Sequence, residues 1–209
     1  ILYKMKWKKK RKSHHSTSNT DSDSEDDNSF KNVQIQDNHI YFYGDVNPEN
    51  AMALVMTINK FNYEKKKYDE LFLHIQSDGG TISDAFAIIG SMLSSQIPIN
   101  TIVEGSASSA ATLISVVGDH RSINQHAVML IHQPRGGMFG KKSEMDDEIK
   151  NIDQVEKKCK SLYKKYTNLT DKQLKSIFHH DIEWSSKQCL QYGLVDKINK
   201  PRKRRRLNS

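Results

Sequence analysis

The chain has few cysteines and no long apolar run. Its 209 residues include only two cysteines, Cys159 and Cys189, which lie in helical patterns away from any cluster of metal-ligating residue types. We therefore expect two free thiols in a reducing compartment, with neither a disulfide nor a metal site. No apolar stretch reaches the length needed to cross a membrane, and no secretory signal is present. These absences favour a cytoplasmic location.

Apolar residues are scarce at both ends of the chain. Hydrophobic residues make up 36% of the sequence, and residues 1–29 and 200–209 are almost entirely polar. The net charge of +7 is concentrated in the same ends, in the basic runs 8–12 and 202–206. Segments of this composition cannot bury a core, so we expect a disordered charged tail over 1–29 and a disordered basic tail over 200–209. One folded domain is expected over 30–199. The C-terminal run also resembles a nuclear-import signal, which makes the nucleus the alternative location.

Between the tails, short apolar runs alternate with amphipathic stretches. Buried parallel strands are expected at Leu71–Ile75, Ile99–Val103 and Val128–Ile131, and helices are expected after Pro48, over 85–93 and over 110–117. This alternation predicts an α/β fold with βαβ crossovers, a mainly parallel sheet and flanking helices. A long charged helix over 144–167 has only a thin apolar stripe, which predicts that it projects and packs on another subunit.

Three of the expected strand ends carry groups that suit acyl transfer. One strand runs into a corner of small residues at Ser109, another into Gly79-Gly80, and a third into His132. A serine nucleophile needs a base, and its oxyanion needs about two N–H donors, which a helix start and a glycine can supply. The residues leave several choices open. The candidates are Ser106, Ser108 and Ser109 for the nucleophile, His120, His126 and His132 for the base, and Asp171, Asp181 and Asp196 for the acid.

Three motifs in this order resemble the proteolytic subunit of the Clp protease. They are Gly105-Ser106-Ala107-Ser108-Ser109-Ala110-Ala111, Met129-Leu130-Ile131-His132-Gln133-Pro134 and Gln191-Tyr192-Gly193-Leu194-Val195-Asp196, and the resemblance extends over about residues 33–199. It implies a fold like that of crotonases, with stacked ββα units, a mainly parallel sheet, flanking helices and a protruding handle helix over 144–167. It assigns Ser109 as nucleophile, His132 as base and Asp181 as acid, with the backbone N–H groups of Gly80 and Ala110 as oxyanion donors.

The resemblance also implies an activity and partners. Members of this family are self-compartmentalising serine endopeptidases, built as two stacked heptameric rings, that cleave unfolded polypeptides through an acyl-enzyme. A partner AAA+ ATPase uses ATP to feed them, and the peptidase itself needs no cofactor. This chain departs from the family at three places. Asp78 stands where the family has proline, Ala111 stands where it has glycine, and a charged tail stands where the family has its axial loop.

Two other functions are compatible with parts of the sequence. A ring scaffold or nucleic-acid-associated protein with a vestigial peptidase site would use the basic ends. A crotonase-type acyl-CoA enzyme would rely on carboxylates, and Glu104 is the only acid close to the serine corner. The complete set of serine, histidine and aspartate favours the peptidase.

Overall fold

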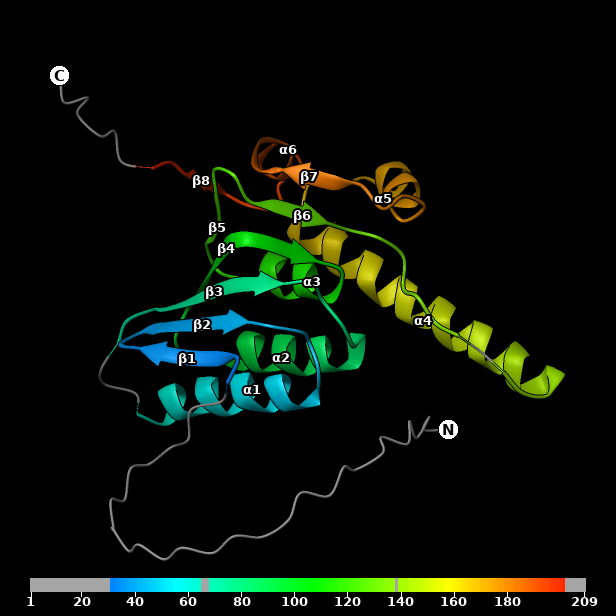
Figure 1. Ribbon diagram of the computed structural model, residues 1–209, viewed down its shortest axis with the longest axis horizontal. Coiled ribbons are helices and arrows are strands. Elements are labelled where there is room, and N and C mark those ends of the chain that lie inside the picture. The colour runs from blue at the N-terminus through cyan, green and yellow to red at the C-terminus, as the bar shows by residue number, and fades with distance from the viewer. Residues whose placement is uncertain (1–30, 65–67, 138, 202–209) are drawn as a thin grey trace, which may run out of the picture.

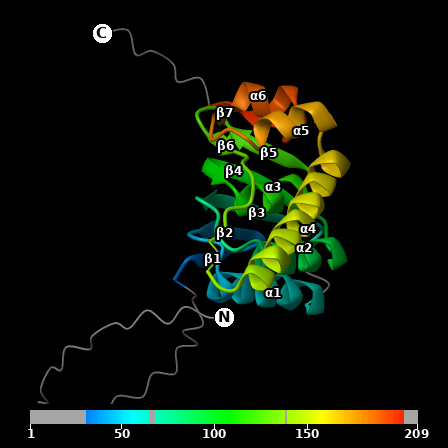
Figure 2. The same cartoon turned by 90° about the vertical axis from the view of Figure 1, so that its right-hand side faces the viewer.

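The computed structural model describes residues 31–64, 68–137 and 139–201. The predicted tail over 1–29 and nearly all of the predicted tail over 200–209 lie outside the described residues. The part between them is a mixed sheet with helices, as the sequence predicted (Figures 1 and 2).

Eight strands and six helices follow one another in the described part of the chain. The strands are β1 (Val33–Gln36), β2 (His39–Tyr43), β3 (Leu71–Ser77), β4 (Ile99–Ser108), β5 (Arg121–Asn124), β6 (Val128–Leu130), β7 (Glu183–Ser185) and β8 (Lys197–Asn199). The helices are α1 (Pro48–Tyr63), α2 (Ile82–Ser94), α3 (Ala110–Val116), α4 (Lys142–Tyr166), α5 (Asp171–Ile177) and α6 (Ser186–Gln191).

The sheet is mainly parallel. Its order is β1-β2-β3-β4-β5-β8, with β6 paired to β4 and to β7. Neighbours from β2 to β8 along this path are parallel, and only the β1–β2 and β6–β7 pairs are antiparallel. This topology confirms the α/β prediction. The sequence pattern does not predict β5 and β7, because each is short and carries a single large apolar side chain.

The side-chain alternation of the strands separates the two faces of the sheet. The apolar residues at the odd-numbered positions of β3, which are Leu71, Leu73 and Ile75, are fully buried in the core. The opposite face carries a row of hydrogen-bonded polar groups. His39 Nδ1 lies 2.8 Å from His74 Nε2, and His74 Nδ1 lies 2.6 Å from Glu104 Oε1. Asn124 donates to the other carboxylate oxygen of Glu104 at 2.6 Å. The carboxylate of Glu104 is therefore held on this outer face.

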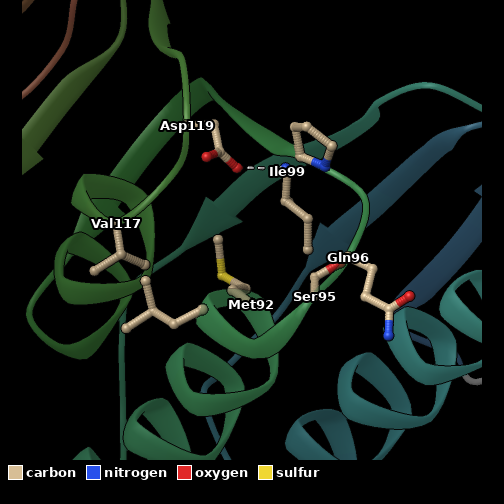
Figure 3. Close-up of a pocket in the computed structure, with 8 residues that line it drawn as sticks. Met92, Ser95, Gln96, Ile99, Val117 and Asp119 are labelled. Carbon is tan, nitrogen blue, oxygen red and sulfur yellow. Dashed lines mark hydrogen bonds between the residues drawn. The ribbon is translucent and has the colours of Figure 1, made fainter.

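Strand β4 is longer than the sequence predicts. Its start is fixed by Asp119, whose carboxylate accepts a hydrogen bond from the Ile99 N–H at 2.7 Å (Figure 3). Its first half pairs with β5 and its second half with β6, so the strand ends at Ser108 and not at Val103. The small residues of the second half have low strand propensity, but neighbours on both sides supply their ladder hydrogen bonds.

Helix α4 projects from the body of the domain (Figure 1). Its buried residues, Cys159 and Tyr163, lie in its C-terminal part, where the helix packs against α3. Further toward its N-terminus the helix is mostly exposed, and Ile149 is 49% exposed. The projection agrees with the predicted handle, and the packing of this helix on another subunit stays a prediction. No helix among the described residues is both long enough and apolar enough to span a bilayer.

Arg121 on β5 forms hydrogen bonds with the end of α4, with the turn after α6 and with Asp196 just before β8. Its Nη2 lies 2.5 Å from Asp196 Oδ1, and its Nη1 donates to the Gly193 carbonyl oxygen at 3.0 Å and to that of Tyr166. The Arg121 hydrogen bond holds the pKa of Asp196 below its ordinary value of 3.8. The pair therefore stabilises the fold at neutral pH, and this contribution is lost as the pH falls through the lowered pKa.

We expect Arg121→Met to lower the free energy of unfolding by about 2–3 kcal/mol, somewhat less than for a fully buried pair because Asp196 is partly exposed. The variant leaves the carbonyl oxygens of Tyr166 and Gly193 without their donor. Urea denaturation at neutral pH measures the change. Lys150→Met is the matched control, because both partners of the Lys150–Asp147 pair are exposed, and we expect less than about 0.5 kcal/mol there. Equal losses in the two variants would contradict the prediction.

Candidate active site

Ser109 occupies a strained corner between β4 and α3. Its backbone angles are φ 53° and ψ −123°, in a region that side chains other than glycine rarely adopt. Its N–H donates to the Leu130 carbonyl oxygen at 2.8 Å, which fixes the corner against β6. Such a sharp strand-to-helix turn lifts a serine hydroxyl out of the sheet and places it at the start of a helix.

Strand pairing brings His132 to the same place. Ser108 and Leu130 are partners in the parallel β4–β6 ladder, so the two strands end side by side. Ser109 is the first residue after β4, and His132 is the second residue after β6. Both residues line one small pocket. None of the other candidates lines this pocket. Ser108 is the last residue of β4 and precedes Ser109 in the chain. Ser106 accepts a hydrogen bond from the Gln76 side chain at 2.9 Å, and His120 and His126 are exposed.

The rest of this pocket is apolar or neutral, lined by Ile82, Ala110, Leu113, Pro134, Cys159, Tyr163 and Phe178. Burial raises the pKa of the Cys159 thiol to about 11 and raises the pKa of Tyr163 as well, so both stay protonated at neutral pH. The Tyr163 hydroxyl lies 2.5 Å from Thr112 Oγ1, which in turn donates to the Ser109 carbonyl oxygen at 2.6 Å. These bonds support the corner from the side of α4.

The loop after α5 carries Asp181 toward His132. The Gln133 N–H donates to the Phe178 carbonyl oxygen at 3.2 Å, which joins the end of α5 to the residue after the histidine. Asp181 Oδ1 then lies 3.9 Å from His132 Nδ1. The other two candidate acids have different partners. Asp171 begins α5 and pairs with Lys164, and Asp196 pairs with Arg121.

Sequence reasoning missed Arg135, which binds the same carboxylate. Its Nη2 donates to Asp181 Oδ2. His132 Nδ1 is buried and has no hydrogen-bond partner among the residues that the structure describes. The base and the acid are thus neighbours that are not yet hydrogen-bonded. The only signal in the sequence was an arginine placed three residues after the histidine.

The turn after β3 brings the glycine pair to the corner. Gly79 has φ 95°, and a Cβ on it would lie 2.7 Å from Ser109 Cβ. Gly80 has φ 145° and sits against Val46, whose carbonyl oxygen would lie 2.2 Å from an added Cβ. The glycine that faces Ser109 is therefore Gly79, whereas the resemblance assigns a role only to its neighbour Gly80.

The backbone N–H groups at this corner differ in whether they already have an acceptor. The Gly79 N–H has one, because it donates to Ser77 Oγ at 3.1 Å. Within the described ranges, no acceptor is found for the N–H groups of Gly80 and Ala110, the two residues expected to serve the oxyanion. Nor do three His, Cys, Asp or Glu side chains gather there in a way that could hold a metal ion. The arrangement thus offers a hydroxyl, an imidazole, a nearby carboxylate and free N–H groups.

Comparison with known proteins agrees with these observations. The family model described as Clp protease matches residues 22–202. The chain belongs to the Clp protease family. A relative from Pleurastrum terricola, the "ATP-dependent Clp protease proteolytic subunit", is 28% identical over 165 residues, which cover 78% of this chain and 84% of the relative. Membership of the Clp protease family implies a peptidase, and the eight-stranded sheet with flanking helices is consistent with the fold of that family.

Proposed function

We propose that this member of the Clp protease family is a serine endopeptidase that hydrolyses peptide bonds of unfolded polypeptides through an acyl-enzyme. The observation that carries the proposal is the meeting of Ser109 and His132 in one pocket, with Ser109 at a strained strand-to-helix corner. Family membership supports the peptidase class, and the corner geometry supports serine as the nucleophile.

In the proposed mechanism, the Ser109 hydroxyl attacks the carbonyl carbon of the substrate while His132 accepts the hydroxyl proton. The N–H groups of Gly80 and Ala110 stabilise the oxyanion, and α3 adds its positive end to them. The C–N bond then breaks as His132 gives the proton to the leaving amine. A water molecule then attacks the acyl carbon while His132 accepts a proton from it, and the bond to Ser109 Oγ breaks as His132 returns that proton to the serine oxygen, which releases the acid product. Asp181 orients His132 and stabilises its charged form.

The proposal extends to assembly and to an ATPase partner. The thin apolar stripe of α4 has little to pack on within one chain, and Ile149 on it is about half exposed, which supports contact with further copies. The name of the Pleurastrum terricola relative includes ATP dependence, which supports an ATPase partner for this chain. We therefore propose a closed, self-compartmentalising assembly of stacked heptameric rings. ATP is used by the partner and not by this subunit.

Neither alternative function gains support from the described residues. A crotonase-type reaction would need Glu104 at the reacting centre, but its carboxylate is bound by His74 and Asn124 on the outer face of the sheet. Glu104 is also absent from the residues that line the Ser109 pocket.

A fluorophosphonate probe tests the proposal directly, because it reacts with serines activated by a neighbouring base. The full chain is separated by size-exclusion chromatography with light scattering, each fraction is treated with the probe, and the modified peptide is sequenced by mass spectrometry. We expect one adduct, on Ser109, in the fraction with the mass of the assembly. Heat-denatured protein is the control and should not react. An adduct on another serine, or none in any fraction, would contradict the proposal.

A further inference from the structure

One carboxylate at the candidate site has two competing partners. Asp181 Oδ2 is bound by Arg135, whereas Asp181 Oδ1 lies 3.9 Å from His132 Nδ1. A hydrogen bond between N–H and oxygen requires about 2.7–3.2 Å, so the histidine is too far away by roughly 1 Å. The buried Nδ1 of His132 finds no other partner among the described residues. In this arrangement the arginine, and not the histidine, holds the acid.

The chemistry of the two partners explains this preference. A guanidinium is always charged and presents several donors in a fixed plane, which suits a carboxylate. A neutral imidazole offers one uncharged donor, and charge-assisted hydrogen bonds are roughly twice as strong as neutral ones. The other titratable groups that line the pocket, Cys159 and Tyr163, stay neutral because burial raises the pKa of each. No charge on that side draws Asp181 toward His132.

The ion pair is also placed where it can be broken. The side chains of Arg135 and Asp181 are 69% and 56% exposed, so solvent and salt reach both. His132, by contrast, is only 11% exposed. A change at the surface can therefore release the carboxylate without disturbing the buried imidazole.

We propose that Arg135 is a positioning residue that holds Asp181 away from His132, so that the hydrogen bond between acid and base forms only when the Arg135–Asp181 pair opens. The inference rests on the proposed function, because it concerns the activation of Ser109 by His132. The Arg135–Asp181 ion pair would thus restrain the active site of this chain, because it keeps the acid from binding the base. Any acidic surface that binds Arg135 would relieve it.

The variant Arg135→Gln tests this restraint in the full-length chain. The readout is the rate of Ser109 modification by the fluorophosphonate probe at increasing concentrations of NaCl. We expect Arg135→Gln to be labelled about two- to fivefold faster than wild type at low salt, because an exposed ion pair contributes at most about 1 kcal/mol. The rate of this variant should change little with salt. Wild-type labelling should rise with salt toward the rate of the variant. Arg135→Lys should keep the salt response, because lysine also binds a carboxylate.

Lys172→Gln is the matched control. Lys172 is exposed on α5, and its replacement removes the same charge from a site where no contact with Asp181 is found. It should behave as wild type. Slower labelling of Arg135→Gln, or an unchanged rate with the salt response of wild type, would overturn the proposal. A general charge effect would accelerate both glutamine variants alike, and that outcome would overturn it as well.

A crystal structure of Arg135→Gln separates this inference from the proposed function. We expect the distance from His132 Nδ1 to Asp181 Oδ1 to shorten from 3.9 Å to about 2.8 Å. A distance that stays at 3.9 Å in the variant would overturn the restraint even if Ser109 is reactive. If no variant is labelled at any salt concentration, the proposed function fails, and the distance still decides whether Arg135 holds the acid.

Discussion

The variant Ser109→Ala should lose peptidase activity by at least about 10³-fold, because the acyl-enzyme cannot form without the hydroxyl. His132→Ala should lose a similar factor, since no other base lines the pocket. The double variant should be no worse than either single variant, because the two residues act on the same step. Turnover of a fluorogenic peptide by the purified assembly measures all three.

The fold should survive both changes. Ser109→Ala removes one oxygen at a corner whose backbone is held by the bond to Leu130. Ser106→Ala is the matched control, because it also removes a serine hydroxyl. That hydroxyl belongs to β4 and accepts a hydrogen bond from the Gln76 side chain. We expect the control to keep activity within about threefold of wild type, since Ser106 does not line the pocket and a neutral hydrogen bond contributes only modestly to stability. Substantial turnover by Ser109→Ala would rule out Ser109 as the nucleophile.

The sequence predicted the buried strands well, because those strands are continuous apolar runs. β3 begins at Leu71 and β4 begins at Ile99, as expected. It missed β5 and β7, whose residues are mostly polar and become strands only because a neighbouring strand supplies the hydrogen bonds. It also ended β4 too early, since small residues give no strand signal of their own. Hydrophobic patterns therefore predict strands that bury apolar side chains. They do not predict polar strands that form only by hydrogen bonding to a neighbouring strand.

The candidate site shows a similar limit. Convergence of three strand ends was foreseeable, because parallel strands end at one edge of a sheet. Which glycine faces Ser109 depends on the backbone angles of the turn, and the sequence shows only a Gly-Gly pair. The contact between Arg135 and Asp181 depends on where the loop after α5 lies, and no local pattern reports that. The choice of Ser109, His132 and Asp181 over their rivals came from resemblance and not from the residues alone.

The variant Gly79→Ala should reduce peptidase activity by at least about 10²-fold, which is the expected cost of displacing a catalytic group by about 1 Å. Its Cβ would lie 2.5 Å from the Ser108 carbonyl oxygen and 2.7 Å from Ser109 Cβ. Both neighbours belong to the corner itself, so the strain cannot be relieved by turning a flexible side chain. The positive φ of 95° adds a further cost for alanine.

Gly90→Ala separates this contact from a general effect of replacing glycine. Gly90 lies within α2, and a Cβ built on it meets no described atom within 4 Å beyond its chain neighbours and the adjacent backbone of its own helix. Alanine there should stabilise the helix by about 0.5–1 kcal/mol and leave turnover unchanged. Thermal unfolding and peptide turnover are measured for both variants. The methyl group added in Gly79→Ala would displace Ser109, so this variant should lose activity at temperatures where it is still folded. Wild-type turnover by folded Gly79→Ala would show that the close approach of the turn does not position Ser109.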